Sequence, residues 1–187
     1  NALPIQPGDV KWKDVNGDGV IDNYDMVKVG NTVPKWTGGF NTELSWKGIS
    51  LGIQLEARYG NKVLNQDRSL FEADGFYGDS NIWKGALNYW KKPGDTNVLP
   101  KPIYNNSSNS SQISTRYLED GSYLRIKDIT LAYNLPSKWT KKALMSGVRI
   151  YASALNLYTF HNMNYWDPEH GTTGATIISY PMTRSMI

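Results

Sequence analysis

Residues 39–59 read GFNTELSWKGISLGIQLEARY, and this stretch decides the fold. Before the Lys47-Gly48 pair, apolar and polar side chains alternate, with Phe40 and Trp46 on the apolar side. The same alternation resumes after Gly48 and continues to the end of the stretch. Period-two alternation in two neighbouring segments joined by a tight turn is typical of a β-hairpin. The stretch therefore predicts two antiparallel strands, each with one apolar face.

Three further segments carry strand signals, at 122–135, 148–159 and 179–187. The alternation in the second blurs at Leu155–Leu157, which predicts a β-bulge. Short and long connections alternate along the chain, and strands of about nine to eleven residues can cross a bilayer when tilted. We therefore expect an antiparallel all-β fold. It is either part of a transmembrane β-barrel with apolar faces in lipid, or a soluble β-sandwich with those faces inside.

Residues 60–121 form the longest connection, and a loop of this length is expected to be functional. A short loop helix is expected over 81–91, and the polar tract at 105–112 is typical of a flexible loop. Aromatic residues here can stack on sugar rings or pack the loop helix against its neighbours. The seven-residue spacing of the two tryptophans, which places both on one helix face, favours packing. The candidate substrate-binding residues are Tyr77, Trp83, Tyr89 and Trp90.

Residues 14–25 read DVNGDGVIDNYD and carry oxygen donors at the spacing of an EF-hand loop. Gly19 falls where the loop needs a sharp turn, and Ile21 is expected to anchor the loop to a core. Position twelve is the shorter Asp25, and the flanks do not suit a helix–loop–helix unit, so an isolated, dockerin-like Ca²⁺ loop is predicted. A metal-free cluster of turns is the alternative. The predicted ligands are Asp14, Asn16, Asp18, the Val20 carbonyl, Asp22 and Asp25.

The composition narrows the class of protein. The chain has 187 residues with a net charge of +3, and its basic residues are scattered, which argues against a nucleic-acid partner. It has 0 Cys and 2 His, so thiol chemistry is excluded and a histidine-based catalytic or zinc site is not expected. The sequence has no apolar run as long as a membrane-spanning helix, and it starts at Asn1 without Met, as a processed or cut product would.

Several motifs together resemble the late region of SusC/RagA-type TonB-dependent transporters, and they cover nearly the whole chain. The family carries a GD-x-K-(aromatic)-K-D-x-NGDG-x-ID segment, a YLEDGSYLR signature, an NL-(aromatic)-TF strand and a DPE element. The matching stretches are GDVKWKDVNGDGVID at 8–22, YLEDGSYLRIKDITLAYNLP at 117–136, VRIYASALNLYTF at 148–160, YWDPE at 165–169 and SYPMTRSMI at 179–187.

The resemblance implies a C-terminal portion of an outer-membrane importer. Residues 1–36 would be an extracellular loop with the calcium site, and 37–187 would be barrel strands with the long loop 60–121. Such transporters import oligosaccharides or peptides with TonB-linked energy and perform no covalent chemistry. The implied partners are a SusD-like lipoprotein, outer-membrane lipid, the plug and upstream barrel, and TonB through an upstream segment absent here.

Strand directions counted back from a periplasmic C-terminus place the calcium loop, 60–121 and 160–178 outside the cell. The polar faces would then look into the lumen, with Glu56 and Arg58 among the lining residues. One alternative is a secreted, calcium-stabilised β-sandwich that binds carbohydrate. Another is a glycosidase, although no carboxylate pair stands apart from the calcium loop and the ordinary strand charges.

Overall fold

The computed structural model describes residues 5–72, 81–96, 98–104, 110–164, 166–169, 175–176 and 185–186. The chain divides into two compact units. The sheet unit comprises Asn31–Val63, Glu119–Gly174 and Ser179–Ile187. The loop unit comprises Asn1–Gly30, Leu64–Leu118 and Ala175–Ile178.

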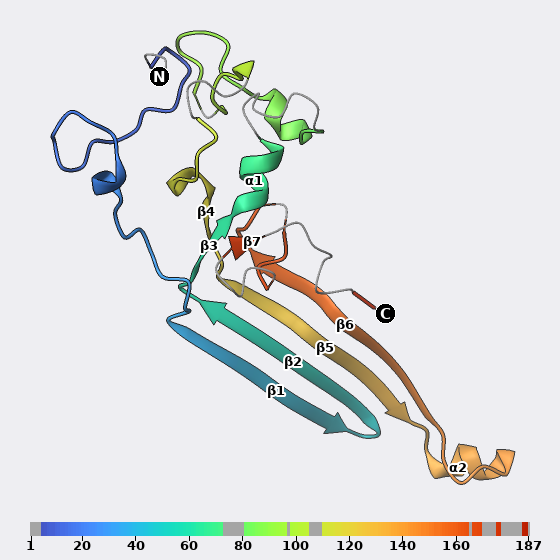
Figure 1. Cartoon of the computed structure of the whole chain (residues 1–187). Coiled ribbons are helices and arrows are strands. Elements are labelled where there is room, and N and C mark those ends of the chain that lie inside the picture. The colour runs from blue at the N-terminus through green and yellow to red at the C-terminus, as the bar shows by residue number, and fades with distance from the viewer. Residues whose placement is uncertain are drawn as a thin grey trace. The chain divides into compact units, whose positions relative to one another are not determined.

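The sheet unit is built on four long antiparallel strands that lie side by side (Figure 1). Their order in the sheet is β1-β2-β5-β6, which is their order along the chain, although shorter elements intervene between β2 and β5. The strands are β1 (Trp36–Trp46), β2 (Ile49–Tyr59), β5 (Tyr123–Asn134) and β6 (Arg149–His161). All four strand segments expected at 39–59, 122–135 and 148–159 are confirmed, with small differences at their ends.

The predicted hairpin is confirmed in detail. β1 and β2 pair without a break, from Trp46 opposite Ile49 to Trp36 opposite Tyr59. Lys47 and Gly48 have φ of 45° and 87°, and positive φ at both central residues is what a tight type I′ turn requires. A side chain at Gly48 would also place its Cβ 2.9 Å from the Asn134 carbonyl oxygen, so glycine is needed there twice over.

Two bulges interrupt the ladder of β5. Between β2 and β5 the register shifts so that Lys127 has no direct partner. Between β5 and β6 the pairing moves from Ile126–Tyr158 to Asp128–Leu155, which leaves an extra residue on β6. This confirms the bulge predicted around Leu155–Leu157, and Asn156 adopts a positive φ of 48° within it.

One face of the sheet is apolar and open. Trp36, Phe40, Leu44 and Trp46 of β1 are 52–68% exposed, and Leu131, Ile150 and Phe160 of the other strands are 53–61% exposed. In a β-sandwich these side chains would be buried against a second sheet. Their exposure fits the wall of a barrel, where this face meets lipid. In the described part of the chain, no helix has the length and apolar character that a membrane span needs.

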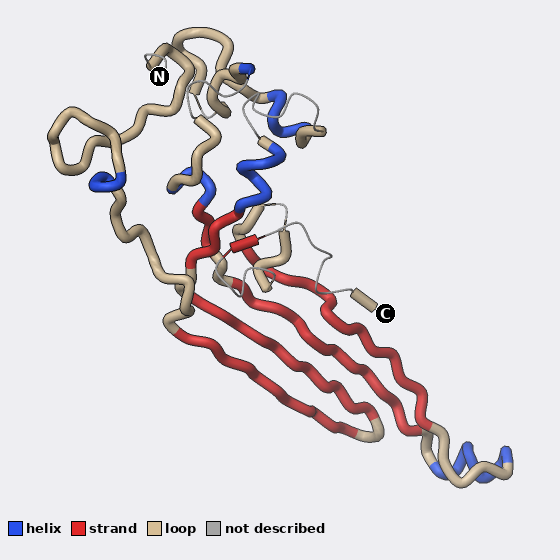
Figure 2. Tube along the Cα trace, viewed as in Figure 1, coloured by secondary structure: helices blue, strands red, loops and turns tan. Residues whose placement is uncertain are grey.

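Shorter elements complete the chain (Figure 2). The boundary between the two units runs through β3 (Lys62–Asn65) and β4 (Leu118–Asp120), which form a second sheet of order β4-β3-β7 with β7 (Ala175–Thr176). The loop unit contains α1 (Gln66–Phe71) and 3₁₀ turns at Asn23–Asp25, Lys84–Leu87 and Thr115–Tyr117. In the sheet unit, α2 (Ser137–Thr140) and the 3₁₀ turn Lys141–Ala143 lie between β5 and β6.

The helix expected over 81–91 is wrong, because only the single 3₁₀ turn Lys84–Leu87 forms there. The Trp90 N–H donates to the Leu99 carbonyl at 2.8 Å, and the Leu99 N–H donates to Asn88 at 2.9 Å. This pairing with a later segment replaces helical hydrogen bonds, as tertiary contacts often override local propensity. The short loop helix of the fold is α1 instead, capped at its start by the Asn65 side chain.

Two expectations lie largely outside the described residues. In the polar tract at 105–112, only 110–112 are described. In the strand expected over 179–187, only Ser185 and Met186 are described, and Met186 forms an antiparallel bridge with Leu155 of β6.

Candidate functional site

The polar face of the sheet carries a charged cluster centred on Arg125. The side chain of Arg125, the third residue of β5, is fully buried although it carries a charge. Its Nε donates to Thr159 Oγ1 at 2.8 Å, and its terminal nitrogens bind Asp167, with one bond of 2.6 Å, and Glu169. We call these four residues the Arg125 cluster.

Strand register and a short turn bring the cluster together. Arg125 and Thr159 are direct partners in the β5–β6 ladder, so both side chains stand on the same face. The carboxylates come from residues 166–169, after the end of β6, where Pro168 is fully buried. Asp167 also accepts a hydrogen bond of 2.9 Å from the Glu169 N–H, which fixes the turn between them. The guanidinium fork is thus shared by two carboxylates held on one rigid turn.

A second ion pair extends the cluster along the same face. Lys127 Nζ lies 3.0 Å from Glu56 Oε2 and 3.7 Å from Glu169 Oε1. The Tyr123 hydroxyl donates to Glu56 Oε1 at 2.7 Å, and the Arg58 guanidinium lies 5.5 Å from the centre of the Tyr123 ring. Each carboxylate is engaged by a cation. This arrangement holds segments together, whereas glycosidases keep a carboxylate pair poised for acid–base work.

Sequence reasoning placed Glu56 and Arg58 on this face but did not identify Arg125 or its partners as a site. A signal existed in the alternation of β5. Ile126 and Ile129 are three residues apart, so the period of two breaks at Lys127, where the bulge forms. The bulge lets consecutive polar residues serve one face. Asp167 and Glu169 lie outside β5, so the alternation of that strand does not indicate them.

The predicted calcium loop closes on its own backbone. Asp14 accepts from the Gly17 N–H at 2.6 Å and from the Gly19 N–H at 2.9 Å. Asn16 accepts from the Asp18 N–H at 2.9 Å, and Asp18 accepts from Val20 at 2.8 Å. The side chains at positions one, three and five therefore turn into the loop, as the EF-hand order requires of its ligands.

The end of the loop is closed by Asp25. Its Oδ1 accepts from the Val15 N–H at 2.7 Å and its Oδ2 from the Asp22 N–H at 2.9 Å. These hydrogen bonds, that from Asp22 first, lower the pKa of Asp25 below its ordinary value. The expected anchor is wrong, because Ile21 is 47% exposed. Among the described residues, no three acidic, histidine or cysteine side chains gather closely enough to hold a metal ion, so the calcium ligand set stays a prediction.

The aromatic candidates of the long loop have separate partners. The Trp83 ring lies 4.7 Å from the Phe71 ring, centre to centre. The Trp90 ring packs on Gly8, where an added Cβ would be 2.5 Å from it. Lys91 Nζ lies 5.3 Å from the centre of the Tyr89 ring. The two tryptophans therefore pack on different segments and do not share a helix face. Tyr77 lies outside the described residues, and substrate binding by all four stays a prediction.

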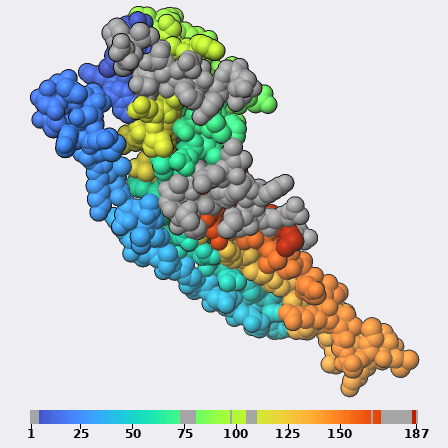
Figure 3. All heavy atoms as spheres, viewed as in Figure 1, coloured from blue at the N-terminus to red at the C-terminus, as the bar shows by residue number. Residues whose placement is uncertain are grey.

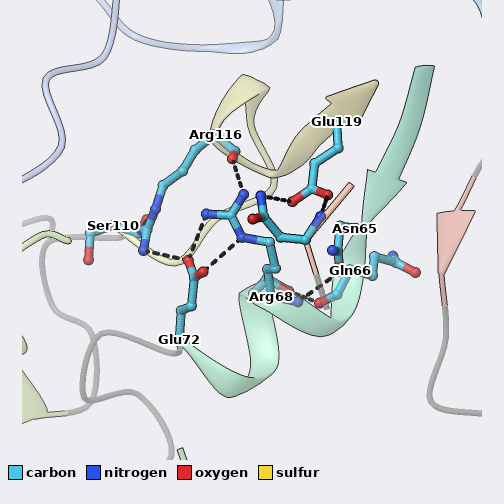
Figure 4. Close-up of polar contacts among 9 residues, drawn as sticks. Asn65, Gln66, Arg68, Glu72, Ser110, Arg116 and Glu119 are labelled. Atoms are coloured by element: carbon cyan, nitrogen blue, oxygen red, sulfur yellow. Dashed lines mark hydrogen bonds and ion pairs between the residues drawn. The ribbon is translucent and has the colours of Figure 1, made fainter. Parts of the chain in front are cut away.

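An ion-pair network holds α1 to the end of the long loop (Figure 4). Arg68 Nε donates to Glu72 Oε1 at 2.7 Å, one turn along the helix, and Arg116 approaches the other oxygen of Glu72 at 3.3 Å. Arg68 also donates to the Arg116 carbonyl at 3.2 Å, and Arg116 to the Ser110 carbonyl at 3.1 Å. These contacts give the loop unit a fixed frame near α1.

No family model matches the chain. The TonB-dependent receptor P3 of Formosa agariphila is 32% identical over 163 residues, which cover 87% of the chain and 16% of that receptor. A solved structure of the RagAB peptide transporter superposes with a TM-score of 0.69 at 32% identity, covering 83% of the chain and 16% of its own. A structure of the RagAB peptide importer in the closed-closed state superposes with a TM-score of 0.67 at 30% identity. The match covers 90% of this chain and 19% of that chain. The chain therefore spans less than a fifth of the length of these relatives.

Proposed function

The chain belongs to the TonB-dependent receptors of the outer membrane, and from this membership we propose that it forms part of the wall of an importer. Its four long strands are antiparallel barrel strands. In the proposal, the apolar face of the sheet meets lipid and the polar face looks into the lumen. The function is transport, without covalent chemistry.

The observation that carries this proposal is the contrast between the two faces of one sheet. Large apolar side chains such as Phe40 and Leu131 are more than half exposed on one face. On the opposite face, Arg125 is fully buried among carboxylates. The strands have 11 to 13 residues, which is enough to cross a bilayer at the tilt of a barrel strand.

The solved relatives support a proposal for the cargo. Those structures are of a peptide transporter, which supports a peptide as cargo, with an oligosaccharide as the second candidate. We propose that a SusD-like surface lipoprotein docks on the extracellular loops and that TonB acts through another part of the receptor. Uptake of labelled peptides and of labelled oligosaccharides by cells with and without the intact receptor decides between the cargos.

We also propose that the 14–25 loop binds Ca²⁺ on the extracellular side, with the six ligands predicted above. The register of its oxygen donors and the inward turn of Asp14, Asn16 and Asp18 support this. Extracellular calcium is plentiful, so an affinity in the millimolar range is sufficient. The bound ion would hold the loop in one conformation.

Introducing a charge on one or the other face of β2 tests whether the apolar face of the sheet meets lipid. In the full-length receptor, Ile53→Arg puts a charge on the apolar face, and Gln54→Arg puts the same charge on the polar face, opposite Asp128. We expect Ile53→Arg to lower the free energy of unfolding in lipid by about 2–4 kcal/mol, and Gln54→Arg to change it little. Urea unfolding in bilayers measures both. If the two variants lose equal stability, the apolar face does not meet lipid and the proposal is wrong.

A further inference from the structure

The turn from β5 to β6 has an unusual surface. It contains α2 and the 3₁₀ turn Lys141–Ala143, and it forms the lobe at the end of the sheet in Figure 3. Lys138, Lys141 and Lys142 are all exposed in it. No acidic residue occurs between Leu135 and Ile150, so the charge of these lysines is not compensated within the turn.

Apolar side chains of the same turn are also exposed. Trp139 is 59% exposed, Leu144 is 98% exposed and Met145 is 45% exposed. The turn is nevertheless well bonded, because the Leu144 N–H donates to Lys141 at 3.1 Å and the Met145 N–H donates to Thr140 at 3.0 Å. Lysines beside an exposed tryptophan and long aliphatic side chains are typical of segments that lie at a lipid–water interface.

A shallow groove lies on the sheet beside this turn. Ile49, Tyr133 and Ile150 are direct partners across three strands and form its first row. The next row ends at Ala152, whose small side chain leaves room beside Leu131. The groove has a volume of about 470 Å³ and is lined mainly by apolar atoms. Its walls therefore suit a hydrocarbon chain.

The β5–β6 turn, which carries the lysines, begins and ends at one end of this groove. Lys47, from the hairpin turn, lines it directly. The β5–β6 turn leaves the sheet after Asn134 and returns at Arg149, and the neighbouring residues Tyr133 and Ile150 line the groove. Arg149 adds a further exposed cation at the return. An amphiphile with a negative head and an apolar tail matches this order of groups.

We propose that this end of the sheet binds an anionic phospholipid of the membrane, with an acyl chain in the groove and the phosphate among Lys47 and the lysines of the turn. The proposal rests on the proposed function, since the groove faces lipid only if the sheet is part of a barrel wall. The occupant is a lipid of the bilayer leaflet at this end of the barrel. The uncompensated lysines make the site prefer an anionic headgroup over a neutral one.

The test uses the full-length receptor in neutral detergent and native mass spectrometry with phosphatidylglycerol or phosphatidylcholine. The intact receptor is expected to retain phosphatidylglycerol in preference. The triple variant Lys138→Gln, Lys141→Gln, Lys142→Gln should bind it about a hundredfold more weakly, from the usual effect of each lysine near an anionic surface. The matched control is Lys11→Gln, Lys13→Gln, Lys28→Gln, three exposed lysines of the loop unit, which should bind as the intact receptor does.

The groove has its own pair of variants. Ala152→Leu fills it and should reduce retention of both lipids several-fold, whereas Ala154→Leu, on the next row of the same face, should not. Equal binding of the two lipids by the intact receptor, or unchanged binding by the lysine variant, overturns the proposal. Equal binding of the two lipids is the result expected if the lysines instead bind an acidic protein partner. The Ile53 and Gln54 variants separate the two failures: if they behave as expected while the lipid preference is missing, only the lipid site is wrong.

Discussion

Two regions of the molecule gather carboxylates and neutralise them differently. In the Arg125 cluster, Asp167 and Glu169 share a buried guanidinium, and Lys127 supports Glu169 from the same strand. In the 14–25 loop, the aspartates accept only N–H hydrogen bonds from the loop itself and the Asn16 amide. None of them forms an ion pair with a lysine or arginine in the part of the chain that the structure describes.

The difference concerns what each region needs from its surroundings. A carboxylate pair with its own buried arginine is complete, and it holds two segments together under any ionic conditions in which the charges persist. Four aspartates without a cation repel one another, and N–H groups offset that repulsion only in part. We therefore expect the cluster to be insensitive to added divalent ions and the loop to be sensitive to them.

The largest effect is expected from Arg125→Met, which removes the cation and leaves both carboxylates without it. We expect the full-length receptor to lose about 2–4 kcal/mol of unfolding free energy. This is below the usual effect at fully buried pairs, because Asp167 and Glu169 remain 20% and 23% exposed. Urea unfolding measures the loss.

Lys127→Met is the matched control on the same strand. Its ion pair with Glu56 is more exposed, at 25% and 35%, and should contribute less than about 1 kcal/mol. Adding Asp167→Asn and Glu169→Gln to Arg125→Met should restore part of the stability, since the uncompensated charges are then gone. Equal losses in the Arg125 and Lys127 variants would show that the buried arginine has no special role.

An intermediate effect is expected from calcium. At a concentration ten times the dissociation constant, Ca²⁺ should stabilise the receptor by about 1.4 kcal/mol, and Asp14→Ala with Asp18→Ala should abolish the gain. Asp95→Ala is the control, because Asp95 accepts from the Lys91 and Lys92 N–H groups in a turn outside the loop. Thermal unfolding with calcium and with a chelator measures each variant. A receptor equally stable in both conditions would show that the loop binds no calcium.

The smallest effect is the pH dependence of the loop. The pKa of Asp25 is lowered by the N–H groups of Asp22 and Val15, so its stabilisation is complete above the ordinary value of 3.8 and is lost as the pH falls through the lowered pKa. We expect protection of the Val15 amide from hydrogen exchange, corrected for intrinsic rates, to decline over that acidic range. In Asp25→Asn the protection should not follow pH. Protection that is constant in the unmodified loop would contradict the assignment.

The strands were predictable because their signals are local. Alternation over 39–59 and the Lys47-Gly48 pair specify the hairpin without any other part of the chain. The bulge near Asn156 was also visible, as a blurred period. The helix expected over 81–91 failed because Leu99 captures the backbone of Trp90, and no pattern within 81–91 contains Leu99.

The site was less predictable for the same reason. Asp167 and Glu169 lie 42 and 44 positions from Arg125, and the three meet only through the β5–β6 register. The motif YWDPE at 165–169 could be identified by resemblance, but its partner could not. The break in alternation at Lys127 was the one local sign of the cluster. It predicts a bulge but does not identify the residues that contact Arg125.

The turn at Lys47 and Gly48 has a consequence for the order of assembly. β1 and β2 are joined with no intervening chain beyond these two residues, so their hairpin can close within microseconds of the segment becoming available. β5 must wait until residues 60–122 have been looped out, at a much larger entropic cost. We therefore expect the β1–β2 hairpin to form before β5 pairs with β2.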